Sequence, residues 1–267
     1  MSGLPSRVLV VAAGLPIVLG LAWAGGWIMF AGVGVASVLA LHELYHIGRS
    51  FRPLVLAGYA GTVACLLGIE LGGIAWMAGG LLLTLPLAFF FVLFAETRQS
   101  PTVSVSFTML GAVWIGLGLG HLLLIRAIPE DGRLAIFAVL LAVFATDTGG
   151  YLVGRTIGRH RLAPAVSPGK TWEGFVAGAI TGIFVTWIAL YKTGFADGWR
   201  SLVLGAAIVG AATIGDLFES LVKRDLRVKD TGRLLGGHGG ILDRIDSLLA
   251  AAPAAYYTLA AFGEVPL

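Results

Sequence analysis

The chain has 267 residues, of which 57% are hydrophobic and only 12% charged, and its formal net charge is +3. Soluble domains average about 25% charged residues, and disordered chains combine low hydrophobicity with high charge, so this composition excludes both classes. The small net charge argues against a nucleic-acid-binding surface. The single cysteine, Cys65, excludes an intrachain disulfide.

Apolar runs recur along the whole chain, most of them close to the roughly 20 residues that a membrane-spanning helix needs. The first run ends at Ala22-Trp23-Ala24, like a signal-peptide cleavage site, but the eight runs that follow favour an uncleaved helix. The Gly25-Gly26 and Gly72-Gly73 pairs predict tight turns between adjacent helices. We therefore predict an all-α polytopic integral membrane protein with about nine transmembrane helices, at residues 8–24, 26–42, 54–70, 73–95, 104–125, 133–147, 174–191, 201–221 and 247–262.

The basic residues predict the orientation of these helices. With a cytoplasmic N-terminus, the inner loops hold fourteen of the 18 lysines and arginines and the outer loops hold four. This is the bias of the positive-inside rule. We therefore predict that the N-terminus is cytoplasmic and that the C-terminus lies outside.

The two parts of the chain differ in polarity. All lysines, and ten of the 15 acidic residues, lie in residues 147–267. We therefore predict an N-terminal transmembrane scaffold at 1–132 and a C-terminal catalytic membrane region at 133–267, with cytoplasmic loops 147–173 and 223–246. In the seventh run, glycines recur every four residues and predict close helix packing; they are Gly174, Gly178 and Gly182.

The first polar loop is rich in glycine and basic residues and leads into the seventh helix. Glycines let backbone N–H groups approach an anion, and the N-terminus of a helix favours a phosphate. The segment 167–171, Ser-Pro-Gly-Lys-Thr, lacks the first glycine of a P-loop, and no strand is expected before it. A basic loop that binds anionic lipid headgroups is the alternative.

The second polar loop begins and ends with carboxylates. Asp216, Glu219, Ser220 and Lys223 share one helical face, and carboxylates within an apolar span usually face a polar cavity or a partner. Asp243 and Asp246 open the ninth helix, and an antiparallel pair of helices would bring them beside Asp216. Three such carboxylates favour a Mg²⁺ ion. In the alternative, they pair only with arginines, Arg224 and Arg244.

Basic residues surround these carboxylates, and a metal beside anion-binding side chains is what phosphoryl and nucleotidyl transfer need. His238 lies between glycine pairs, which favours contact with a phosphate. Five other polar residues of the apolar runs are interpreted as packing or interface groups: His42, Glu43, His46, Glu70 and His121.

The 27 residues from Ser220 to Asp246 resemble the signature of the phosphatidate cytidylyltransferases. The matching positions read Ser-Leu-Val-Lys-Arg, then Lys229-Asp230, Gly232, Leu235-Gly236, His-Gly-Gly-Ile from 238, and Asp-Arg-Ile-Asp from 243. Residues 147–174 resemble the conserved stretch that precedes this signature. The chain departs from the pattern at Gly236, where many members have proline, and at Ala165, where a basic residue is common.

The resemblance implies a Mg²⁺-dependent integral membrane enzyme. We place it in a bacterial-type inner membrane, and the bias of the basic residues places its active site on the cytoplasmic side. It would convert CTP and phosphatidate into CDP-diacylglycerol and pyrophosphate, as a multi-helix protein, often a homodimer, with a monovalent cation such as K⁺ beside the magnesium. By position, Asp216 and Asp243 would be metal ligands, and Asp246 would support them or ligate as well. Lys223 would be catalytic. The phosphates would be held by Ser167, Lys170, Lys223, Arg224, Lys229, His238 and Arg244, and we place Asp147, Glu173 and Asp230 in the same substrate-binding set.

Two other functions remain open. A CTP-dependent polyprenol or lipid kinase would transfer the γ-phosphate to an alcohol and release CDP. An ion transporter would use the intramembrane carboxylates, although the sequence has no repeat of the kind found in secondary transporters.

Overall fold

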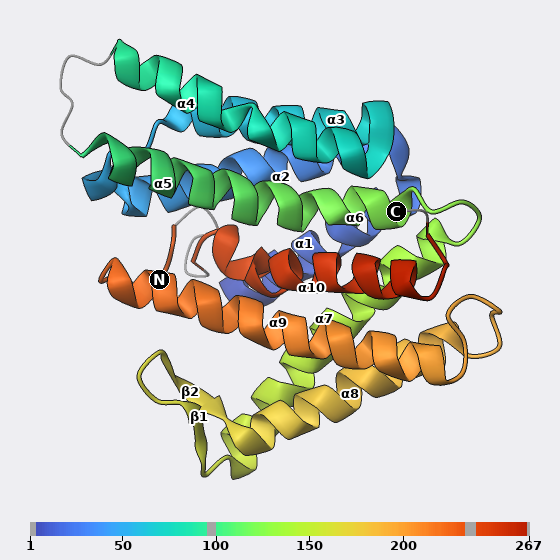
Figure 1. Ribbon diagram of the computed structural model, residues 1–267. Helices are drawn as coiled ribbons and strands as arrows, with labels where there is room; N and C mark the ends of the chain where they lie inside the picture. Colours follow the sequence, from blue (N-terminus) through green and yellow to red (C-terminus); the bar gives the residue numbers. More distant parts are fainter. Residues whose placement is uncertain (1–3, 95–99, 233–238, 266–267) are drawn as a thin grey trace. The chain divides into compact units, whose positions relative to one another are not determined.

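The computed structural model describes residues 4–94, 100–232 and 239–265, with side chains from residue 14 onward. Its described part is almost entirely helical, with one short two-stranded sheet (Figure 1). The elements in chain order are α1 (Leu4–Ala24), α2 (Gly26–Ile47), the 3-10 turn η1 (Arg49–Phe51), α3 (Val55–Leu82), α4 (Thr84–Leu93), α5 (Pro101–Gly111), the π-helical segment η2 (Ala112–Leu117), α6 (Gly118–Arg126), α7 (Gly132–Ile157), β1 (Arg161–Ala163), β2 (Ser167–Thr171), α8 (Trp172–Leu190), α9 (Trp199–Asp225) and α10 (Leu242–Ala261).

Six stretches of the described residues are long and apolar enough to cross a membrane. α1, whose side chains are described only from residue 14, counts as a shorter apolar helix, Gly14–Ala24, and α10 is less apolar because its first turns carry Asp243, Arg244 and Asp246. A multi-pass helical membrane protein is thus confirmed, whereas the count of nine spans and the orientation of the termini stay predictions. The six stretches are Gly26–Ile47, Val55–Leu93, Pro101–Arg126, Gly132–Ile157, Trp172–Leu190 and Trp199–Asp225.

Both predicted glycine turns are present. Gly25, with φ of 66°, separates α1 from α2. Within Val55–Leu93 the backbone leaves the helical conformation at Gly72 and Gly73, and Gly73 has φ of 67°, a value that glycine adopts without strain. Beyond this turn the chain folds back on itself. Gly80 then lies so close to the backbone of Ala64 that a Cβ atom at position 80 would collide with it. The predicted runs 54–70 and 73–95 are therefore two helical segments.

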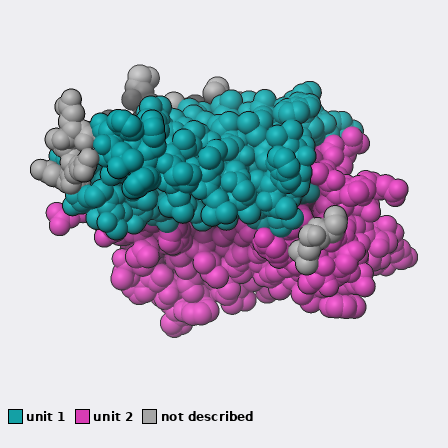
Figure 2. Space-filling view, turned by 45° about the horizontal axis from the view of Figure 1, so that its top comes forward, with its two compact units in different colours: residues 1–124, 228–245 teal, residues 125–227, 246–267 magenta. Residues whose placement is uncertain are grey.

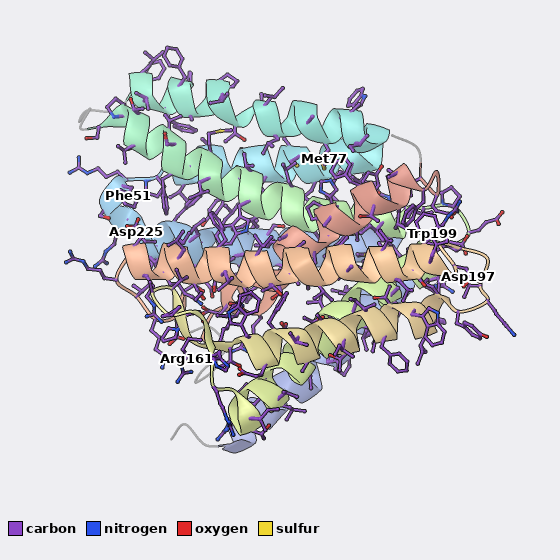
Figure 3. All side chains as sticks on the ribbon, turned by 60° about the horizontal axis from the view of Figure 1, so that its bottom comes forward. Phe51, Met77, Arg161, Asp197, Trp199 and Asp225 are labelled. Atoms are coloured by element: carbon purple, nitrogen blue, oxygen red, sulfur yellow. The ribbon has the colours of Figure 1, made fainter. Side chains whose placement is uncertain are left out.

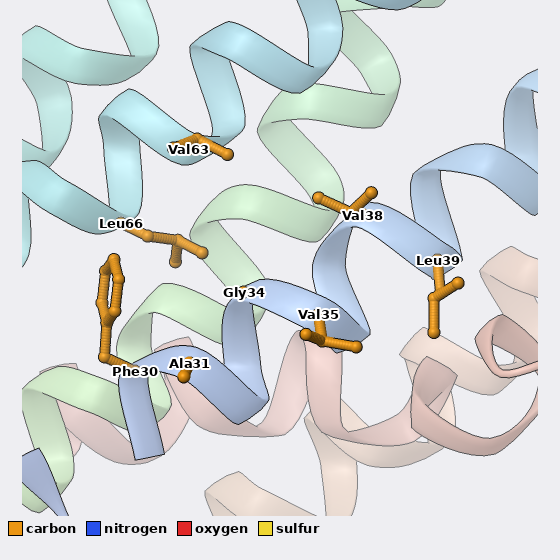
Figure 4. A pocket seen from close by; sticks show the side chains of 8 residues that line it. All are labelled: Phe30, Ala31, Gly34, Val35, Val38, Leu39, Val63 and Leu66. Atoms are coloured by element: carbon orange, nitrogen blue, oxygen red, sulfur yellow. The ribbon is translucent and has the colours of Figure 1, made fainter. Parts of the chain in front are cut away.

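The outer faces of several helices carry large apolar side chains. Trp27, Leu71, Trp76 and Phe89 are each more than half exposed. A pocket of about 390 Å³ on α2 and α3 is lined by apolar residues only (Figure 4). In water such surfaces would favour aggregation or binding, but they are the expected lining of a protein that faces lipid tails.

α7 and α8 pack together through the predicted glycine stripe. A Cβ atom on Gly174 would lie 2.7 Å from the carbonyl oxygen of Gly150, and one on Gly178 would lie 2.7 Å from that of Thr146. Small residues let two backbones approach this closely. The interpretation of the stripe as a packing feature is confirmed.

Both polar loops are shorter in the structure than predicted. The predicted start of loop 147–173 was wrong, because α7 continues through Asp147 to Ile157. The glycines that follow Asp147 do not end the helix but pack against α8. The remainder contains an antiparallel hairpin, β1–β2, so the expectation that no strand precedes the next helix was also wrong. In loop 223–246, α9 extends to Asp225 and α10 begins at Leu242.

The chain forms two compact units, coloured separately in Figure 2. The first comprises residues 1–124 and 228–245, and the second comprises residues 125–227 and 246–267. Each has its own buried side chains, such as Leu44 and Ile115 in the first and Ile136 and Ile208 in the second. Segment 228–245 is thus counted with the N-terminal helices. The functional regions 1–132 and 133–267 stay predictions.

Candidate active site

In the second unit, Asp216 of α9 forms an ion pair with Lys170 of β2. The Lys170 Nζ lies 2.6 Å from Asp216 Oδ2, and both side chains are about three-quarters buried. Ser220, one turn further along α9, donates to the other Asp216 oxygen at 3.4 Å. The alternative in which Asp216 pairs with Arg224 is not what the structure shows, because the Arg224 Nε donates to the Val166 carbonyl at 3.2 Å.

Two further carboxylates of the second unit accompany Asp216. α10 lies against α9 at Gly215, where a Cβ atom would be 2.6 Å from the Asp246 carbonyl oxygen. The Asp246 carboxylate interacts electrostatically with Asp216 and with Asp147 of α7. Lys170 offsets part of this negative charge at Asp147, and Lys223 does so at Asp246. Asp246 thus lies beside Asp216 where α10 meets α9, as expected, whereas Asp147 of α7 is exposed.

Lys223, the predicted catalytic lysine, forms an ion pair with Glu219 one turn earlier on α9. The Glu219 side chain is only 1% exposed, and that of Lys223 is 15% exposed. α9 itself runs from Trp199 to Asp225, which mark its two ends in Figure 3. Glu219 was absent from the predicted site residues, although it shares the helical face of Asp216 and Lys223.

The hairpin and the first turn of α8 hold one more predicted residue each, Ser167 and Glu173. Ser167 begins β2, and Thr171 ends it and caps α8, its hydroxyl accepting from the Gly174 N–H at 3.1 Å. Glu173, in the first turn of α8, accepts from the backbone N–H groups of Arg159 at 3.1 Å and His160 at 3.3 Å. It also contacts the His160 ring, with Oε1 2.7 Å from Nδ1. Glu173 therefore shapes the segment that leads into β1.

Asp243 lies in the first unit, where it organises its own segment. Its Oδ2 atom accepts hydrogen bonds from the Thr231 N–H at 2.9 Å, the Thr231 hydroxyl at 3.0 Å and the Gly240 N–H at 2.7 Å. The buried Glu43 of α2 binds the same segment through Thr231, Ile241 and Leu242. Sequence reasoning assigned Glu43 to packing and so missed this role.

Three of the remaining predicted residues, Lys229, Asp230 and Arg244, lie in the first unit, and all three are exposed. His238 lies outside the described residues. In neither unit do the described residues gather three or more His, Cys, Asp or Glu side chains that could hold a metal ion.

Apolar helices long enough to cross a membrane, together with the Lys170–Asp216 and Lys223–Glu219 ion pairs, define a multi-pass membrane protein with a charged site in its second unit. The profile of the cytidylyltransferase family matches residues 5–262. The chain belongs to the cytidylyltransferase family, a family of nucleotidyltransferases, as the sequence resemblance predicted.

Curated relatives are similar over most of this chain. A phosphatidate cytidylyltransferase of Mycobacterium bovis is 37% identical over 246 residues, which cover 85% of this chain and 78% of the relative. One of Staphylococcus haemolyticus is 31% identical over 252 residues, covering 92% and 95%. One of Bacillus subtilis is 37% identical over 159 residues, covering 59% of each chain. The similarity thus includes the N-terminal helices as well as the signature.

Proposed function

We propose that this chain is a phosphatidate cytidylyltransferase, which transfers CMP from CTP to phosphatidate and yields CDP-diacylglycerol and pyrophosphate. The observation that carries the proposal is the ion pair between Lys170 and Asp216, because it joins the basic hairpin to a carboxylate of α9. The names of the curated relatives agree with this reaction.

The reaction needs no strong protein base. A phosphate oxygen of phosphatidate attacks the α-phosphorus of CTP, the bond from that phosphorus to the β-phosphate bridging oxygen breaks, and pyrophosphate leaves with the electron pair. The difficulty lies in bringing two anions together. Fixed cations offset their repulsion and the charge that develops on the leaving group. In this chain Lys170, Lys223 and Arg224 are the cations for that task.

The carboxylates suit a magnesium ion. Mg²⁺ takes oxygen ligands and usually uses one or two carboxylates together with substrate phosphates. Asp216 and Asp246 are two neighbouring oxygen donors of one unit, with lysines beside them, and as carboxylates they are the donor type that such an ion takes. When bound, it would neutralise phosphate oxygens and the leaving pyrophosphate. Asp243 as a further ligand and K⁺ as a second cation belong to the same proposal.

The protein's own residues would bind and orient the two substrates. Lys170 can exchange Asp216 for a phosphate oxygen without leaving β2, since both are anionic partners for its ammonium. The buried Glu219 fixes the position of Lys223. Ser167, Asp147, Glu173, Lys229, Asp230, His238 and Arg244 complete the proposed substrate-binding set, with the roles that the family resemblance implies.

The proposed location is the cytoplasmic side of a bacterial inner membrane, supported by the distribution of basic residues and by the bacterial relatives. The substrates would then be CTP from the cytoplasm and phosphatidate from the bilayer. A homodimer is proposed from the family resemblance alone.

A product assay tests this function. The full-length protein in detergent receives phosphatidate, Mg²⁺ and CTP labelled at the α-phosphate, and both products are measured. We expect labelled lipid and pyrophosphate in equal amounts. A lipid kinase would instead leave the label in CDP, and a transporter would carry ions without consuming CTP; either result contradicts the proposal.

A further inference from the structure

Glu43 is a buried carboxylate of α2 that binds segment 228–245 of the same unit. The residue is only 3% exposed. Its oxygens accept hydrogen bonds from the Ile241 N–H at 3.0 Å, the Leu242 N–H at 2.9 Å and the Thr231 hydroxyl at 3.1 Å. A buried charge is tolerated only when such partners replace water. Both carboxylate oxygens therefore accept hydrogen bonds from this segment.

The segment is built closely around this carboxylate. A Cβ atom on Gly232 or on Gly240 would collide with the Glu43 carboxyl group. Ile241 and Leu242 lie where α10 begins, and the first N–H groups of a helix have no partners within it. Negative charge at this end is also favoured by the helix dipole. Glu43 thus caps α10 from 198 positions away in the sequence.

Thr231 connects Glu43 to Asp243. The Thr231 hydroxyl lies 3.1 Å from Glu43 Oε2 and 3.0 Å from Asp243 Oδ2. A hydroxyl has one hydrogen to donate, so the two carboxylates share a single donor. The Thr231 N–H keeps a second bond to Asp243 at 2.9 Å. A displacement of Glu43 therefore changes the hydrogen bonding of Asp243.

We propose that Glu43 is a positioning residue for the transfer reaction. It fixes the start of α10 and, through Thr231, the orientation of the Asp243 carboxylate. This inference rests on the proposed function, in which Asp243 is a candidate metal ligand. Glu43 would act through Thr231 and the backbone N–H groups that it binds. The role extends the site to an N-terminal helix that was assigned to the scaffold.

Hydrogen exchange tests the structural step independently of activity. We compare the full-length wild type in detergent with Glu43→Gln, which keeps the size of the side chain but replaces one acceptor oxygen by a donor. Amide exchange in peptides covering 239–245 should become faster. Glu70→Gln, which changes a carboxylate of α3 in the same unit, is the matched control and should leave this exchange unchanged. Wild-type exchange in Glu43→Gln would overturn the proposal.

Kinetics test the positioning step. With CTP and phosphatidate saturating, Glu43→Gln should lower kcat by about tenfold or more and raise the Mg²⁺ concentration needed, the typical effect of changing residues that support metal ligands. Thr231→Val should act in the same direction, while Thr231→Ser, which keeps the hydroxyl, should retain most of kcat. These Thr231 variants decide the question if Glu43→Gln fails to fold.

A merely structural role has a different signature. It would lower the thermal unfolding midpoint but leave kcat per folded molecule and the Mg²⁺ requirement at their wild-type values, and that outcome would overturn the proposal. If the wild type makes no CDP-diacylglycerol, the proposed function fails, whereas the exchange experiment still decides whether Glu43 holds the segment.

Discussion

Lys170 and Asp216, 46 positions apart in the sequence, are joined by an ion pair of 2.6 Å between the hairpin and α9. The pair links the two stretches of the chain in which sequence reasoning placed phosphate binding and metal binding. Each residue thereby offsets the charge of the other.

Replacement of Asp216 should abolish most activity. Asp216→Asn keeps the side-chain shape but removes the charge, so turnover should fall by more than about tenfold, as expected when a catalytic metal ligand is lost. Activity is measured against Mg²⁺ concentration, alongside thermal stability. Asp225→Asn, an exposed carboxylate at the end of the same helix, is the control and should behave like the wild type. A folded Asp216→Asn variant with wild-type Mg²⁺ dependence would contradict the metal assignment.

Replacement of Lys170 should weaken substrate use. Lys170→Gln removes a cation from the anion site, so the KM for CTP should rise and kcat should fall. Initial rates over a matrix of CTP and phosphatidate concentrations measure both effects. Lys192→Gln is the matched control, since Lys192 belongs to the same unit and lies over the Tyr191 ring instead. Identical kinetics in the two variants would contradict this prediction and favour the alternative, in which the hairpin is a basic loop that binds anionic lipid headgroups.

A methyl group on the glycine stripe should destabilise the protein. In Gly178→Ala the new Cβ atom would lie 2.7 Å from the Thr146 carbonyl oxygen, and overpacking of this kind typically costs about 1–3 kcal/mol. The unfolding midpoint in detergent should fall accordingly. Gly210→Ala on α9 places its Cβ in open space and serves as the control. Equal midpoints for the two variants would show that α7 and α8 can separate without loss.

The orientation of the protein can be tested in sealed vesicles. With fourteen basic residues predicted inside and four outside, CTP added to inside-out vesicles should be consumed without permeabilisation. Right-side-out vesicles of the same preparation should need a detergent or a pore. The reverse pattern would show that the predicted topology is inverted.

Local sequence patterns predicted much of this fold. The apolar runs located the helices, and paired glycines located the turns at residues 25 and 72–73, because both signals act over a few residues. Helix ends were less predictable. α7 continues past Asp147, since its following glycines pack against α8, and that contact depends on a helix not yet placed when the sequence is read alone.

The site was predictable where its residues share one helix or one motif. Helical spacing predicted that Asp216, Glu219 and Lys223 share one face of α9, although Glu219 was not among the predicted site residues. Asp243 and Asp246 were predicted from their place at the start of the last helix and from the family signature. Glu43 could not be found in this way, because its hydrogen-bond partners lie 188 to 199 positions further along the chain. A lone acidic residue near the end of an apolar run gives the same local signal whether it packs against a neighbouring helix or caps the N-terminus of a distant one.

The backbone contact between α7 and α8 also has a consequence for biogenesis. Glycine has no side chain whose rotamers must be ordered, so this association costs little side-chain entropy. The two helices are consecutive, and local contacts form faster than distant ones. We therefore expect α7, the hairpin and α8 to assemble as soon as α8 has entered the bilayer. Lys170 would then already be held by the assembled hairpin before α9, which carries Asp216, leaves the ribosome.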